Sequence, residues 1–246
     1  MSAVPEVPAG YRLLSSTPAP KWGIPASLGV LAVWVGVSLA FAVPLLVTIG
    51  DTPPLLLVLS VAVPTIVMAL AALWVARVRG NGPVADFALA PRVRDFAIGI
   101  PAGFAMMVVA GLIAALMQLG SDSEIPVAAG DVFDLVSSSP FAIVLLIFTI
   151  AVIAPIAEEI AYRGMLYSAI ERRFSAAAAV IFSAIIFAAL HFEPQRFPIL
   201  LALGLALGEL RRRTRSTTST IAAHMLINSV AAAGMLASLA TGSSGI

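Results

Sequence analysis

Residues 140–170 read PFAIVLLIFTIAVIAPIAEEIAYRGMLYSAI. The stretch is apolar from Pro140 to Ala157, and it then places two adjacent carboxylates, Glu158 and Glu159, before an arginine, Arg163. An ionisable side chain at bilayer depth is costly, so it marks a candidate functional site. We expect one helix to run from Pro140 through this charged motif to Ile170. We interpret the other segments by the side chains that they can contribute to this candidate site.

The composition predicts a membrane protein. Hydrophobic residues make up 60% of the 246 residues and charged residues 11%, whereas soluble domains have roughly 45 to 50% and about 25%. We therefore expect an all-α, polytopic membrane helix bundle of about seven to eight helices with an intramembrane active-site cavity. The chain contains no Cys, which excludes disulfides and thiolate chemistry.

Long apolar runs separated by polar breaks define the expected spans. They are residues 24–49, 55–76, 96–119, 140–170, 174–191, 198–210 and 218–239, and the run 198–210 is short for a full crossing. A turn part-way through the membrane would explain that shortness. The expected organisation is a flexible cytosolic tail at 1–22, a single transmembrane domain at 23–240 with its motifs in about 140–230, and a short tail at 241–246. Small residues four apart, Gly99 with Gly103 and Gly204 with Gly208, predict close helix packing.

Charge in the loops predicts the orientation. Lys and Arg concentrate at Lys21, at residues 77–94, at 172–173 and at 211–215, whereas the loop 120–139 is acidic and has neither. Because basic loops stay in the cytoplasm, we expect an integral, multi-pass protein of a bacterial-type cytoplasmic membrane, with seven spans, a cytoplasmic N-terminus and an external C-terminus. The basic cluster at 211–215 is interpreted as a topological anchor, so no nucleic-acid partner is expected.

Helical phase separates the two glutamates. Glu159 and Arg163 are four residues apart and share a helix face, whereas Glu158 is rotated by about 100° from Glu159. Arg163 can thus neutralise Glu159 and leave Glu158 for general-base chemistry. Taken alone, the pair Glu159 and Arg163 is better interpreted as a buried structural ion pair.

The two histidines of the chain both follow the glutamates, on separate expected helices. His191 shares a face with Phe187, and His224 shares a face with Asn228, each at a spacing of four. We expect His224 and Asn228 to present an imidazole and an amide to one water-accessible pocket that also contains Glu158. A lone histidine could simply bridge two helices, but two of them with motif-like partners favour a site.

The order of these motifs resembles a known family. Glu158-Glu159-x-x-x-Arg163, Phe187-x-x-x-His191 and His224-x-x-x-Asn228 are similar to the signature of the CPBP family, which includes CAAX-prenyl proteases of the Rce1 type and Abi-like membrane proteins. The resemblance covers about residues 140–230 and extends to Tyr162 and Gly164 around Arg163. The first three spans resemble the family only in hydropathy.

The resemblance implies an intramembrane endopeptidase. It implies that Glu158 activates water with help from His191, that His224 and Asn228 stabilise the oxyanion, and that Glu159 belongs to the catalytic set. Arg163, Phe187 and Tyr162 would orient these groups. The implied partners are a membrane-associated peptide or protein substrate, prenylated or not, and the lipid bilayer.

Two mechanisms and two other functions stay open. Glu158, His191 and His224 form a plausible divalent-metal set, zinc being the usual occupant, and a metal-free mechanism uses the same residues. A non-catalytic immunity or scaffold protein of the same fold, and a proton-coupled transporter, are the alternatives. The sequence carries no signal for the oligomeric state.

Overall fold

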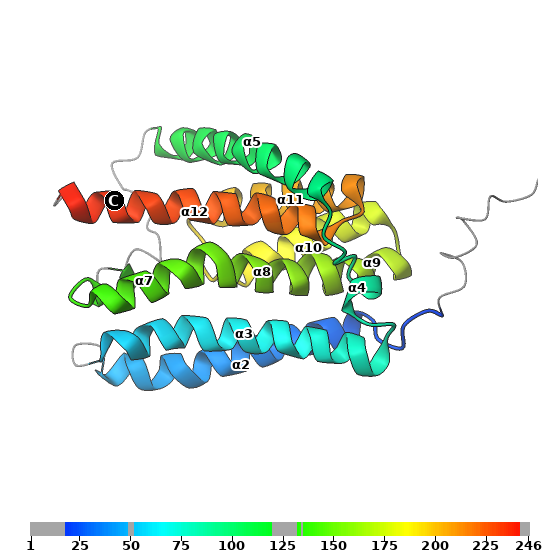
Figure 1. Cartoon of the computed structure of the whole chain (residues 1–246), viewed down its shortest axis with the longest axis horizontal. Coiled ribbons are helices and arrows are strands. Elements are labelled where there is room, and N and C mark those ends of the chain that lie inside the picture. The colour runs from blue at the N-terminus through cyan, green and yellow to red at the C-terminus, as the bar shows by residue number, and fades with distance from the viewer. Residues whose placement is uncertain (1–17, 49–51, 120–131, 134, 242–246) are drawn as a thin grey trace, which may run out of the picture.

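A computed structural model describes residues 18–48, 52–119, 132–133 and 135–241 of the chain, and these residues form helices and turns with no strand among them. The long helices lie side by side along one axis (Figure 1). They are α2 (Ile24–Thr48), α3 (Pro54–Arg79), α5 (Val93–Gln118), a composite helix over Pro140–Arg173, α10 (Ala176–Ala189), α11 (Phe197–Thr214) and α12 (Thr217–Thr241), with a short α4 (Pro83–Asp86) between α3 and α5. The expected all-α bundle is confirmed. The acidic loop and most of the N-terminal tail lie outside the described residues.

The composite helix is the central element. It consists of α7 (Pro140–Phe148), the π-helical segment η2 (Thr149–Ile153), α8 (Ala154–Glu159), a second π-helical segment η3 (Ile160–Leu166), and α9 (Tyr167–Arg173). Ser139 caps its start by accepting a hydrogen bond from the Ala142 N–H, and Pro140 occupies the first turn, where its missing N–H costs nothing. The two π segments lie on either side of Glu158 and Glu159. Such segments are rare in proteins overall, and those that occur are frequently found at functional sites.

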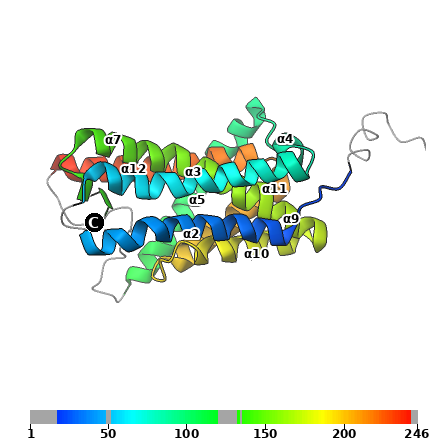
Figure 2. The same cartoon turned by 90° about the horizontal axis from the view of Figure 1, so that it is seen from below.

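The segments α10 and α11 correct the prediction of seven full spans. Five helices of the described chain are long and apolar enough to cross a membrane, and α10 and α11 are not among them. At about 1.5 Å per residue, the 14 residues of α10 span about 21 Å, less than the roughly 30 Å of hydrocarbon. The hairpin α10–α11 covers only part of the bundle's length (Figures 1 and 2). The expected turn part-way through the membrane fits this arrangement.

Small residues bring the helices together as predicted. A Cβ on Gly99 would lie 2.4 Å from the Ser219 carbonyl oxygen, and one on Gly103 would lie 2.7 Å from the Ala223 carbonyl oxygen, so α5 packs directly on α12. A Cβ on Gly204 would lie 3.1 Å from Ala184, so α11 packs closely on α10. The contacts of Gly99 and Gly103 position α12, which carries His224. The contact of Gly204 positions α10, which ends just before His191.

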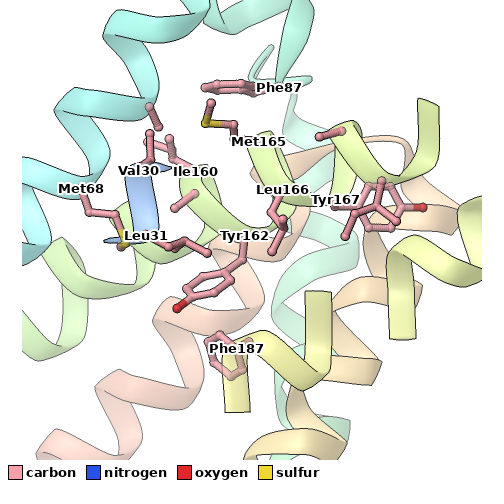
Figure 3. Packing of buried hydrophobic residues seen from close by; sticks show 14 of the residues in the cluster. Val30, Leu31, Met68, Phe87, Ile160, Tyr162, Met165, Leu166, Tyr167 and Phe187 are labelled. Atoms are coloured by element: carbon pink, nitrogen blue, oxygen red, sulfur yellow. The ribbon is translucent and has the colours of Figure 1, made fainter. Parts of the chain in front are cut away.

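The connector between α3 and α5 inserts a side chain into the core. Phe87 is fully buried and lies against Met165 (Figure 3). A Cβ on Gly164 would lie 3.0 Å from the Phe87 Cβ, so Phe87 needs a glycine next to Arg163. Trp22, which the sequence assigned to the flexible tail, is 4% exposed and stacks edge-on against Phe87 at 5.4 Å. The connector thereby packs against η3 next to Arg163.

Candidate active site

Glu159 lies at the centre of a buried charge network. Its side chain and that of Arg163 are both 0% exposed. Arg163 Nη1 donates to Glu159 Oε1 at 2.8 Å, and Arg163 Nη2 donates to the Gly204 carbonyl at 3.1 Å. His224 Nδ1 also lies 2.9 Å from Glu159 Oε1. The predicted ion pair is therefore formed, and it joins the composite helix to α11 and α12.

Glu158 has a different environment from its neighbour. Its side chain is 21% exposed and lines a cavity of about 520 Å³. Its Oε2 lies 3.8 Å from His224 Nε2, which is too long for a direct hydrogen bond. Helical phase predicted this difference between the two carboxylates, and the structure places Glu159 inside the protein and Glu158 at the cavity.

His224 bridges the two carboxylates. Its Nδ1 donates to Glu159 when that carboxylate is ionised, which leaves Nε2 facing Glu158. A carboxylate on Nδ1 holds the imidazole in one tautomer and orientation, as in other sites where a histidine exchanges protons. Nε2 is therefore the nitrogen that can give or take a proton on the Glu158 side.

His191 approaches Glu158 from the end of α10. Its Nδ1 lies 2.7 Å from the Phe187 carbonyl oxygen, and because a carbonyl only accepts, Nδ1 is the protonated nitrogen of the neutral ring. Nε2 is then free to accept a proton. His191 and Glu158 line the same cavity.

Phe187 fills the space between the charged groups. Its ring centroid lies 4.5 Å from the His191 ring, 6.0 Å from the His224 ring and 5.2 Å from the Tyr162 ring. The Arg163 guanidinium carbon lies 4.5 Å from the same centroid. Figure 3 shows Tyr162 and Phe187 next to each other. An aromatic face attracts the guanidinium and excludes water from the Arg163 side of the site.

Asn228 contacts the composite helix. Its Nδ2 donates to the Ile150 carbonyl in η2 at 2.9 Å. Neither Asn228 nor His224 is among the described residues that line the Glu158 cavity. That His224 and Asn228 present both their polar groups to one pocket therefore stays a prediction: His224 Nε2 lies 3.8 Å from Glu158 Oε2, and one Asn228 N–H is used by Ile150. The spacing of four put both residues on one face of α12, but this face contacts the composite helix at two separate places.

The expected metal set does not assemble from these residues. Among the described residues, no group of three His, Asp or Glu side chains is arranged to hold a metal ion. His224 Nδ1 is engaged by Glu159, and His191 Nδ1 is engaged by a backbone carbonyl. These Nδ1 contacts leave the Glu158 carboxylate and the two Nε2 atoms as candidate metal donors, and Glu158 Oε2 lies 3.8 Å from His224 Nε2. Because no three such side chains are gathered closely enough, the described residues do not form a zinc site as they stand.

The first two helices supply much of the cavity wall, which the sequence analysis missed. Trp34, Ser38 and Ala42 of α2 and Met68 of α3 line it together with Glu158. Trp34, Ser38 and Ala42 are spaced four residues apart, so they share one face of an otherwise apolar helix. This spacing could have indicated from the sequence that α2 faces the site. Phe192, whose φ is 55°, forms part of the wall just beyond His191.

The comparison with protein families matches this part of the chain. A family model described as type II CAAX prenyl endopeptidase Rce1-like matches residues 140–230. This segment is therefore similar to the Rce1-like family. The matched segment extends from the start of α7 into α12 and includes Glu158, Glu159, Arg163, His191, His224 and Asn228.

The similarity supports, at the level of the family, an intramembrane CAAX-type endopeptidase. It confirms the resemblance drawn from the three motifs. Searches among curated proteins and among solved structures gave no match. The membrane character rests on the five long apolar helices and on the family.

Proposed function

We propose that the protein is an intramembrane endopeptidase in which Glu158 activates the attacking water. The observation that carries this proposal is the separation of the two glutamates: Glu159 is paired with Arg163 and His224, whereas Glu158 faces a cavity with His191. A base must be able to reach the water whose proton it takes. Of the two carboxylates, only Glu158 meets that condition.

The histidines have separate roles in this mechanism. His191 Nε2 helps Glu158 to position and deprotonate the water, since its Nδ1 is engaged by the Phe187 carbonyl. Once His224 has taken up a proton at Nε2, its Nε2–H, held in place by the Nδ1 contact with Glu159, stabilises the developing oxyanion or returns that proton to the leaving amine. Preorganised donors of this kind contribute about 2.7–4 kcal/mol each to transition-state stabilisation. Tyr162 also lines the cavity and is a second candidate donor.

The cavity supports a membrane-associated substrate. It continues into an apolar groove of about 550 Å³ between α2 and α10, and Val35 and Leu190 line both spaces. The groove has no charged residue among its lining residues. An apolar chain attached to a peptide, such as a lipid anchor or a hydrophobic segment, could enter from the bilayer and bring the peptide to Glu158. We propose prenylated CAAX-like or other membrane-associated peptides as the substrate class.

The test uses purified protein in detergent with a fluorogenic peptide in lipidated and unlipidated forms. Glu158→Ala and Glu158→Gln should lower kcat/KM by about 10²–10⁴-fold, because the general base is lost. Glu209→Gln, an acid at the end of α11 that pairs with Arg212, is the matched control and should retain full activity. Activity that persists in Glu158→Ala would contradict the proposal.

Metal removal tests the mechanism separately. Because the donor groups do not assemble a metal set, we expect cleavage to survive dialysis against EDTA or 1,10-phenanthroline. Loss of activity on chelation and its return with zinc would show a metalloprotease instead. Metal analysis of the purified protein provides the control for incomplete removal.

A further inference from the structure

The Ile150 carbonyl has lost its backbone partner. In an α-helix it would accept from the N–H of Ala154, four residues on, but that N–H donates to the Thr149 carbonyl in the π-helical register. The next candidate in that register is residue 155, which is Pro155 and has no N–H. The π shift and the proline together leave the Ile150 oxygen unpaired within its own helix. A carbonyl without a hydrogen-bond donor in an apolar environment costs free energy.

Asn228 supplies the missing donor from another helix. Its Nδ2 lies 2.9 Å from the Ile150 oxygen. One turn before it on α12, His224 binds Glu159 at 2.9 Å. The helix α12 therefore holds the composite helix at two points, one before Pro155 and one after it. These two contacts set the rotation of α8, the short segment that carries both glutamates.

We propose that Asn228 is a positioning residue: by binding the carbonyl that Pro155 leaves unpaired, it aims Glu158 into the cavity. The proposal rests on the proposed function of Glu158. It assigns Asn228 a role different from the oxyanion donor implied by the family resemblance. At least one of its two N–H donors is used by Ile150.

The proline makes this role testable, because an N–H can be restored. Pro155→Ala returns a donor to position 155, so Ile150 no longer depends on Asn228. Asn228→Ala alone should lower kcat by about tenfold or more with KM nearly unchanged, since the substrate groove is untouched. In Asn228→Ala/Pro155→Ala, kcat should recover to within about threefold of the Pro155→Ala value. An oxyanion donor could not be replaced in this way.

Pro64→Ala is the matched control. Pro64 is also a buried proline inside a spanning helix, α3, and it should not rescue Asn228→Ala. Rescue by Pro64→Ala, or equal kcat for Asn228→Ala with and without Pro155→Ala, would overturn the proposal. So would an Asn228→Ala protein with unchanged kcat.

A second readout does not depend on proteolysis. The chain has no Cys, so Glu158→Cys gives a single thiol at the cavity wall, and its rate of alkylation reports whether position 158 faces the cavity. Asn228→Ala should slow that rate several-fold, and Pro155→Ala should restore it. If no variant cleaves peptide but the labelling follows this pattern, the proposed activity fails and the positioning role stands. If labelling is unaffected by Asn228→Ala, the positioning role fails.

Discussion

Glu159 and Arg163 are retained in the core although neither charge is fully satisfied there. Glu159 Oε2 and Arg163 Nε have no hydrogen-bond partner among the described residues. Removing two charges from water costs more than an imperfect pair returns, so such a pair is poor evidence for stability. Its placement next to His224 indicates a different benefit. The carboxylate fixes the imidazole, and the guanidinium supplies the counter-charge to that carboxylate.

The cost of burying the two charges and the attraction between them predict how Glu159 and Arg163 respond to mutation. Arg163→Met should destabilise the protein by about 3–5 kcal/mol, because Glu159 is left buried without its counter-charge. Glu159→Gln/Arg163→Met should be much less destabilised, since no charge is stranded. The measurement is the free energy of unfolding from SDS titration of the protein in mixed micelles. If the double variant is as unstable as Arg163→Met, the charge pair is not what the core requires.

The sequence allowed part of this site to be predicted. Spacings of four within one helix correctly paired Glu159 with Arg163 and Phe187 with His191. The bond between Asn228 and Ile150 could not be predicted, because it depends on the π register of η2 and on how α12 packs. Local periodicity identifies which residues share a face. It does not identify what that face contacts.

Close packing of helices holds the separate parts of the site in register. The contact of α5 with α12 is made through Gly99 and Gly103, and α12 carries His224. The sequence predicted these contacts from the spacing of small residues, because backbones can approach only where side chains are absent. The half-length hairpin α10–α11 was only suggested by a short apolar run. How far this hairpin reaches into the membrane depends on how it packs against the other helices, which the sequence pattern does not specify.

The glycines of α5 allow a matched test of this packing. Gly99→Ala should destabilise the protein by about 1–3 kcal/mol, because the new Cβ would meet the Ser219 carbonyl oxygen and the backbones must separate. Gly111→Ala, in the same helix with nothing within 4 Å of the added Cβ, should be neutral or slightly stabilising. Thermal unfolding in detergent compares the two. Equal shifts in Tm would show that α5 and α12 are not closely packed at Gly99.

At the scale of the whole molecule, the basic helix ends gather at one end of the bundle. The Arg79 carbonyl accepts from Lys21, Arg172 donates to the Trp22 carbonyl, and Arg215 pairs with Glu171. The Ala88 carbonyl, in the connector before α5, also accepts from the Thr217 N–H. These contacts join the segment before α2, the connector before α5 and the polar ends of α3, α9, α11 and α12. The loops that the charge pattern assigned to one side of the membrane therefore do lie together.

Because basic loops stay in the cytoplasm, this end of the bundle should face inward. Val93, which is 87% exposed at the start of α5, marks that end, and Ser138, an exposed residue before α7, marks the other. In the Cys-free chain, a membrane-impermeant maleimide applied to intact cells should label Ser138→Cys and leave Val93→Cys unlabelled until the membrane is permeabilised. The reverse pattern would mean that the Arg-rich end faces outward. In that case the charge rule would not set the orientation, and Glu158 would lie at a different depth from the cytoplasmic surface.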